Sequence, residues 1–144
     1  MNHSLEIKNS IHIEASSRKI WDCLVNPDKI KLYLYGTDAI SDWKLGSEII
    51  FQGEYNGKEY KDKGIITQFE PNKFFSYYYW SGFSGLEDIK ENYSLVSFEI
   101  KTQNFYNKLV ITQTGFADEA TQKHTDTSWQ NILEKIKEIA ETSD

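Results

Sequence analysis

The sequence predicts an α+β protein in which a strongly curved antiparallel β-sheet wraps around one long C-terminal α-helix. Three observations support this: apolar and polar residues alternate in residues 6–14, strand-like segments follow one another between residues 39 and 114, and residues 118–141 carry helical periodicity. A meander of strands has to bury one apolar face, so we expect the C-terminal helix to cover it.

The N-terminal segments predict one strand followed by two short helices. Residues 6–14 alternate as in a half-buried strand, and Ser16 or Ser17 then offers an N-cap. Apolar residues of the first helix recur at helical spacing at Ile20, Trp21 and Leu24.

The second helix begins at Asn26 and Pro27. Asn26 suits the cap, and Pro27 suits the first helical position, where its missing N–H costs nothing. We expect this helix to turn Ile30 inward together with either Leu32 or Leu34.

The middle of the chain predicts consecutive strands joined by turns. Residues 47–55 alternate, and Asn56-Gly57 follows at once, which is the strongest two-residue hairpin signal. Residues 59–69 supply the return strand. After a turn at residues 71–73, residues 74–80 are dense in aromatic residues that favour strands.

The last third predicts a loop, two strands and a long helix. Residues 81–86 form the loop, and residues 93–101 and 109–114 form the strands. A helix of 24 residues over 118–141 would be about 36 Å long. The last residues, 142–144, are expected to fray. The apolar stripe of the helix consists of Trp129, Ile132, Leu133, Ile136 and Ala140.

Length and charge exclude several classes of protein. A chain of 144 residues predicts a single domain over residues 1–144. The net charge of −6 and a pI near 5.1 argue against a nucleic-acid partner, which would require a basic surface. No apolar run approaches the roughly 18–20 residues of a membrane span. The start lacks the apolar stretch of a signal peptide, so we expect no membrane insertion and a cytoplasmic location.

The residues that carry most chemistry are sparse. Cys23 is the only cysteine and is expected to be structural, which leaves no intrachain disulfide and no cysteine zinc site. His3, His12 and His124 lack metal-ligand spacing. The acidic residues of the connections are expected to stay solvated, with a role for Glu87 or Asp88 at a cavity mouth as the alternative. We therefore expect no catalytic residue, no metal and no cofactor.

Aromatic residues offer the best functional signal, because 4 Trp, 9 Tyr and 8 Phe can fill a core or line a cavity. In residues 77–80 alternation puts one pair of rings on each face of a strand, and the outward pair would pack under a loop or at a dimer surface. Tyr hydroxyls and Trp N–H groups would orient a ligand. The expected cavity lining is Trp21, Tyr33, Trp43, Phe51, Tyr78, Trp80, Phe98, Trp129 and Leu133.

An ordered set of segments resembles the START-like (Bet v 1-like, SRPBCC, helix-grip) domains, and more narrowly the bacterial branch resembling the C-terminal domain of activators of heat-shock protein 90 ATPase. The resemblance covers nearly the whole chain. The matching segments are residues 13–16, 20–24 with Asn26-Pro27, 41–47, 64–66 before 70–74, 109–116, and 129–133.

The resemblance implies a hydrophobic cavity between the sheet and the long helix. Members of this fold bind lipids, hormones or aromatic products, and a minority act as cyclases or hydrolases. We therefore expect non-enzymatic binding of a small hydrophobic or aromatic, lipid-like molecule. The alternatives are a chaperone-linked stress-response adaptor or homodimer, and a cyclase or hydrolase of the same fold.

Overall fold

The computed structural model describes residues 1–142. The expectation of fraying at residues 142–144 is wrong for Thr142, which belongs to the last helix, and lies outside the described residues for 143–144. The described residues confirm the α+β helix-grip fold, with two short helices after the first strand and a long helix at the C-terminal end. In chain order the elements are β1 (Asn2–Ile13), α1 (Ser17–Val25), α2 (Pro27–Tyr33), β2 (Asp38–Ser41), β3 (Glu48–Tyr55), β4 (Lys58–Glu70), β5 (Phe74–Trp80), the 3₁₀ turn η1 (Lys90–Asn92), β6 (Ser94–Thr102), β7 (Asn107–Phe116) and α3 (Glu119–Thr142).

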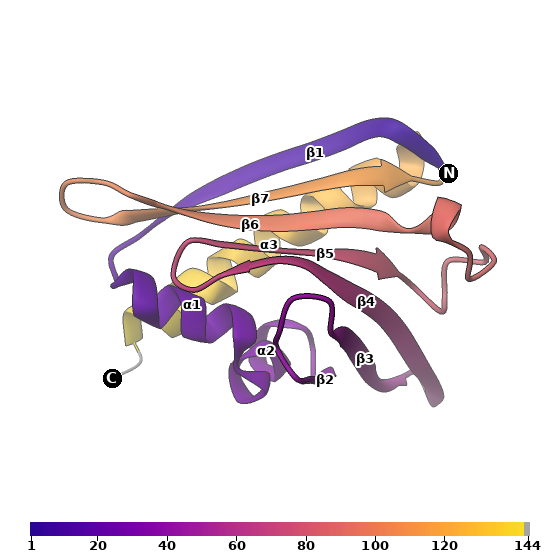
Figure 1. The fold of residues 1–144 in the computed structure, drawn as a ribbon, viewed down its shortest axis with the longest axis horizontal. Helices are drawn as coiled ribbons and strands as arrows, with labels where there is room; N and C mark the ends of the chain where they lie inside the picture. Colours follow the sequence, from indigo (N-terminus) through magenta and orange to yellow (C-terminus); the bar gives the residue numbers. More distant parts are fainter. Residues whose placement is uncertain (143–144) are drawn as a thin grey trace.

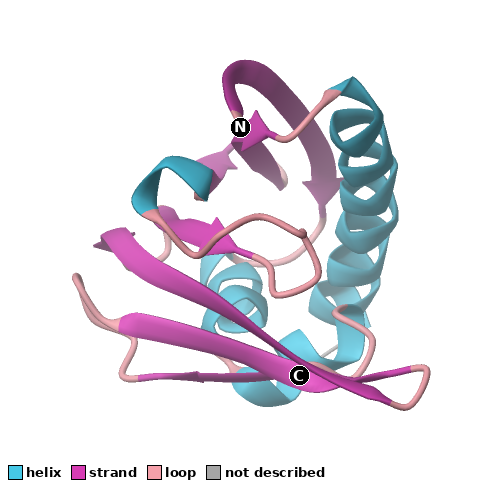
Figure 2. Ribbon diagram, turned by 90° about the vertical axis from the view of Figure 1, so that its right-hand side faces the viewer, coloured by secondary structure: helices cyan, strands magenta, loops and turns pink. Residues whose placement is uncertain are grey.

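Over residues 1–142 the strands form one antiparallel sheet in the order β1-β7-β6-β5-β4-β3-β2. Figure 1 shows the strands from β1 at the top to β2 at the bottom, with α3 behind them and α1 and α2 at one end. Figure 2 shows the curvature of the sheet, with α3 running along one side of it. The concave face therefore meets α3, and the convex face is the outer surface of the sheet.

Local sequence signals set the boundaries of the N-terminal helices. Of the two candidate caps it is Ser16 that acts, because its side chain accepts the N–H of Lys19. Asn26 ends α1 and starts α2, accepting the Asp28 N–H at 3.0 Å. Of the two leucines left open, Leu34 packs inward, whereas Leu32 is 62% exposed.

The register of the sheet follows from its turns. Asn56 and Gly57 both have positive φ, as a tight hairpin turn requires, and Tyr55 pairs with Lys58 across it. The pairing continues from β4 to β5, where a bulge lies between Ile66 and Gln68. These pairings decide which side chains of β4 and β5 reach the concave face.

The expected apolar stripe of α3 is confirmed, since Trp129, Ile132, Leu133, Ile136 and Ala140 are all buried. Polar contacts fix the helix along the edge strand β1. Asn9 donates to the Asp126 carboxylate at 2.7 Å, and the Lys137 ammonium donates to the His12 carbonyl at 2.8 Å. The helix is therefore held along the C-terminal half of β1.

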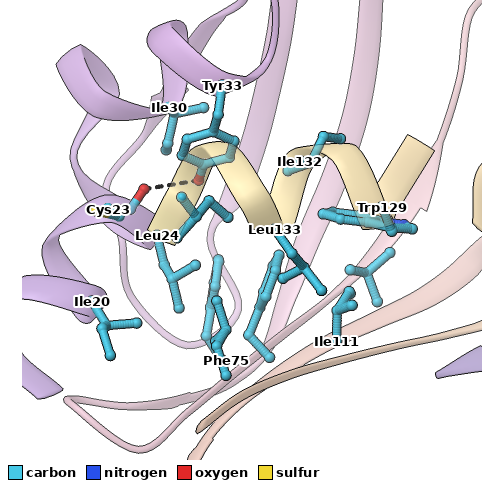
Figure 3. Close-up of a cluster of buried hydrophobic side chains, with 14 of the residues drawn as sticks. Ile20, Cys23, Leu24, Ile30, Tyr33, Phe75, Ile111, Trp129, Ile132 and Leu133 are labelled. Carbon is cyan, nitrogen blue, oxygen red and sulfur yellow. Dashed lines mark hydrogen bonds between the residues drawn. The ribbon is translucent and has the colours of Figure 1, made fainter. Parts of the chain in front are cut away.

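Side chains from α1, α2, β5, β7 and α3 converge on one apolar core (Figure 3). In this core the Tyr33 hydroxyl donates to the Cys23 carbonyl at 2.8 Å. Burial raises the pKa of the Cys23 thiol to about 11, so the thiol is protonated at neutral pH.

Candidate functional site

A small cavity of about 20 Å³ lies between the concave face, the α1–α2 pair and α3. This volume has room for about one water molecule. Side chains therefore fill most of the space between sheet and helix in which we expected a ligand to bind. Five of the residues expected from the sequence line it: Tyr33, Trp43, Phe51, Phe98 and Trp129.

Six further residues, which were not expected from the sequence, also line the cavity: Leu24, Ile30, Leu34, Ile49, Phe75 and Tyr77. The alternation of the strands and the apolar stripe of α1 did contain a signal for several of these residues. Ile49 shares the parity of Phe51 on β3, Phe75 shares the parity of Tyr77 on β5, and Leu24 lies on the apolar stripe of α1. The choice of rings passed over the aliphatic positions, and the choice of Tyr78 and Trp80 on β5 passed over Phe75 and Tyr77 on the opposite face.

Two expected residues, Trp21 and Leu133, are buried in the core beside the cavity without lining it. Trp21 packs edge-on against Phe69 and Phe75, with ring centroids 5.2 and 6.1 Å apart. Both residues therefore belong to the packing around the cavity and not to its lining.

For Tyr78 and Trp80 the expected orientation is wrong, because both belong to the convex face. Tyr78 is 41% exposed, and the Trp80 indole N–H donates to the Leu86 carbonyl at 3.2 Å, which places this ring under the loop after β5. Pairing of β5 with β4 and β6 turns Tyr77 and Tyr79 inward instead. The run of four rings carried no polar residue to distinguish the two faces.

The cavity wall is an aromatic network centred on Phe75. Phe75 stacks on Phe98 with ring centroids 6.2 Å apart, and the ring centroids of Trp43 and Phe75 are also 6.2 Å apart. Trp129 of α3 meets Phe98 edge-on at 5.5 Å. Such offset and edge contacts are favourable between ring quadrupoles, and an aromatic ligand would extend them.

Most polar groups of this region are hydrogen-bonded. The Trp129 indole N–H donates to Gln113 Oε1 at 2.8 Å, and Tyr33 is bound to Cys23 as above. Next to the cavity, the Tyr79 hydroxyl donates to the buried Asp62 carboxylate at 2.6 Å. Burial, and then Asp62, hold the pKa of Tyr79 well above its ordinary value.

Two of the residues that line the cavity are half-buried and come from chain connections. Leu34 follows α2, and Trp43 lies between β2 and β3 with a φ of 55°. The neighbouring Tyr35 and Gly36 also have positive φ, and Thr37 bonds the Tyr60 hydroxyl. Since neither Leu34 nor Trp43 belongs to a strand, their side chains can swing outward without breaking a strand pair.

A larger depression of about 520 Å³ lies elsewhere, between the start of α1, the β4–β5 turn and β6. It is open to solvent, and polar or charged residues such as Glu70, Lys73 and Glu99 line much of it. Small-molecule sites are enclosed and mostly apolar, so this groove is the weaker candidate despite its volume.

The acidic residues considered for a cavity mouth lie away from the cavity. Asp88 pairs with the Lys63 ammonium at 2.6 Å and accepts a hydrogen bond from the Tyr93 hydroxyl, and neither Glu87 nor Asp88 lines the cavity.

Among residues 1–142 no three His, Cys, Asp or Glu side chains form a group that could hold a metal ion. No helix in that part of the chain is long and apolar enough to cross a membrane.

The fold and the ring-lined cavity define a helix-grip protein of the START-like class. Within this class, the chain belongs to the family described as Activator of Hsp90 ATPase homolog 1-like protein, whose model matches residues 14–141. No curated protein matches the chain.

Solved structures with the same fold extend over nearly the whole chain. The solution structure of ChR145 from Cytophaga hutchinsonii is 37% identical, covers 96% of this chain and 94% of its own, and has a TM-score of 0.83. The crystal structure of MLL2253 from Mesorhizobium loti is 18% identical, with 96% and 98% covered and a TM-score of 0.77. The solution structure of the Aha1 dimer from Colwellia psychrerythraea is 21% identical, with 95% and 96% covered and a TM-score of 0.75.

Proposed function

We infer that the protein binds a small apolar or aromatic molecule between the concave face of the sheet and α3, without chemistry of its own. The observation that carries this proposal is the lining of the cavity, which consists of aliphatic side chains and a connected set of rings from β3, β5, β6 and α3. Apolar walls with a few polar groups are typical of small-molecule sites.

Binding requires the cavity to enlarge, because a benzene-sized ligand occupies a cavity on the order of 150 Å³ and the present volume is about 20 Å³. Leu34 and Trp43 are the side chains that can move, since both are half-buried and stand in chain connections. The ligand would then take the place of these side chains against Phe51 and Phe98. This mode of binding is an induced opening of one wall.

The test is a ligand titration followed by thermal unfolding and by NMR. A panel of one- and two-ring aromatic compounds and short fatty acids should contain ligands that raise Tm and shift the resonances of Phe51, Phe98 and Trp129. Filling the wall with Leu34→Phe should abolish this shift. The matched control, Leu32→Phe, changes an exposed leucine of the same helix end and should leave binding intact. A panel without any effect on Tm or on these resonances would refute the proposal.

A second candidate, association with another copy of the chain, rests on the convex face. Ile65, Tyr78 and Leu95 are paired across β4, β5 and β6, and form an apolar row on a face that is normally polar in such sheets. One similar structure is described as a dimer. Sedimentation velocity should then show a dimer that Ile65→Thr dissociates, and a monomer at all concentrations would exclude it. The family description makes a chaperone the other partner to test on this surface.

A further inference from the structure

Two neighbouring tyrosines of β5 point to the concave face and differ in their hydrogen bonds. The Tyr79 hydroxyl donates to Asp62, whose carboxylate also accepts the Gly82 N–H at 2.9 Å. Tyr77 is 6% exposed, and its hydroxyl makes no hydrogen bond with any of residues 1–142. Burial raises the pKa of Tyr77, so the phenol is protonated at neutral pH and able both to donate and to accept.

The Tyr77 hydroxyl is not sealed inside the protein. Within residues 1–142 the fully buried side-chain polar atom without a partner is Asn107 Oδ1, which lies at the start of β7 and does not line the cavity. The Tyr77 hydroxyl therefore retains a small contact with open volume, and the cavity is the volume that Tyr77 lines. A buried hydroxyl without a partner is costly, so its retention needs an explanation.

The Tyr77 ring packs among the aromatic rings of the cavity wall. Its centroid lies 5.3 Å from Phe75, 5.8 Å from Phe51 and 6.5 Å from Phe98. On β4, Gly64 pairs with Tyr79, and a Cβ added to Gly64 would come within 3.3 Å of the Tyr77 ring. Gly64 thus gives the ring room to lie close to the sheet, and the hydroxyl is presented from a fixed position.

Other polar groups of the cavity are already engaged, since Tyr33 is bound to Cys23 and Trp129 to Gln113. The residues that line the cavity include no cationic side chain that could neutralise an anion. A cation would have to be desolvated without a free carboxylate at the wall, because Asp62 accepts from Tyr79 and Gly82. A neutral hydrogen-bonding group matches this environment best.

We propose that the Tyr77 hydroxyl is the polar recognition group of the cavity and that it selects flat aromatic ligands bearing a neutral hydroxyl group. This inference rests on the ligand-binding function proposed above. The aromatic body of the ligand packs against Phe51, Phe75 and Phe98, and its hydroxyl forms the hydrogen bond that the protein does not supply to Tyr77.

The experiment compares phenol with toluene, which differ by a hydroxyl in place of a methyl group, on the wild type and on Tyr77→Phe. We expect the ratio of phenol affinity to toluene affinity to fall about threefold to tenfold in Tyr77→Phe, the effect of one hydrogen bond. Toluene affinity should stay unchanged. The matched control is Tyr78→Phe, which removes a hydroxyl from the exposed face of the same strand and should leave the ratio as it is in the wild type.

The thermal stability of Tyr77→Phe tests the role of the Tyr77 hydroxyl independently of ligand affinity. Tyr77→Phe should keep or raise the Tm of the free protein, because no protein hydrogen bond is lost. A clear fall in its Tm, or an unchanged affinity ratio, would overturn the role of Tyr77 while leaving ligand binding in place. Failure of both phenol and toluene to bind the wild type, together with the rest of the ligand panel, would instead overturn the proposed function.

Discussion

The two faces of β5 carry similar residues in different environments. On the concave face, Tyr77 and Tyr79 are enclosed by the rings of β3 and β6. On the convex face, Tyr78 is largely open to solvent, and Trp80 is covered by the loop after the strand. The role of a ring on β5 is therefore set by the face that it occupies rather than by its chemistry.

The difference has a simple physical origin. Residues of the concave face are covered by the α1–α2 pair and α3, so their rings lose water on all sides and gain edge contacts. Residues of the convex face meet only their cross-strand neighbours, such as Ile65 and Leu95 beside Tyr78. Substitutions on the two faces should therefore differ in their effects on stability.

The largest effect is expected from Phe75→Ala. Phe75 is buried against Trp21, Trp43, Tyr77 and Phe98, and its removal should lower the free energy of unfolding by about 3–5 kcal/mol. Tyr78→Ala, three positions further along the same strand and on its convex face, should cost less than about 1 kcal/mol. Urea unfolding measures both, and equal losses would break the distinction between the faces.

An intermediate effect is expected within the concave face. Tyr79→Phe removes the hydroxyl that donates to the buried Asp62 carboxylate, so it should lower the free energy of unfolding by about 1–3 kcal/mol. Its control is Tyr77→Phe, which removes an unbonded hydroxyl from the neighbouring inward position. If Tyr79→Phe proves as stable as the wild type, Asp62 is satisfied by other donors.

The smallest effect on stability is expected from Tyr93, on the outer side of the molecule. Burial and then the hydrogen bond to Asp88 raise the pKa of Tyr93 to about 12. Because the folded pKa lies above the unfolded value near 10, the contribution of Tyr93 to stability is complete below pH 10 and is lost as the pH rises toward 12. Asp88→Asn should lower this pKa part of the way toward 10.

The measurement is an absorbance titration at alkaline pH, with Tyr93→Phe subtracted to isolate the signal of Tyr93. Near neutral pH, Asp88→Asn should hardly change stability, because the Lys63–Asp88 pair is partly exposed and screened. An unaltered pKa of Tyr93 in Asp88→Asn would show that burial alone causes the shift.

The sequence allowed most elements to be predicted, because their signals are local. The cap at Ser16, the shared cap at Asn26, the hairpin at Asn56-Gly57 and the strand over residues 74–80 all appear as expected. Boundaries moved by a few residues, chiefly in β1, which starts at Asn2 rather than at residue 6. Pairing with β7 extends this strand, and such pairing has no local signal.

The site was predictable only in part. Phe98 stands on a strand whose alternation is clean, and Phe51 on one whose alternation is interrupted only by Ile50, so their inward orientation followed from the pattern. Tyr78 and Trp80 stand in a run of rings, where either parity satisfies a pattern of apolar residues. Pairing with β4 and β6 resolves this ambiguity and turns Tyr77 inward.

The sequence by itself determined the elements, their order and the apolar stripe of α3, because caps, turns and periodicity act over a few residues. Only the tertiary structure decided which rings of β5 face the helix, how little volume remains among them, and which hydroxyl has no partner. These properties depend on side chains brought together from α1, α2, β3, β5, β6 and α3. The free volume left between such side chains is set by their mutual packing.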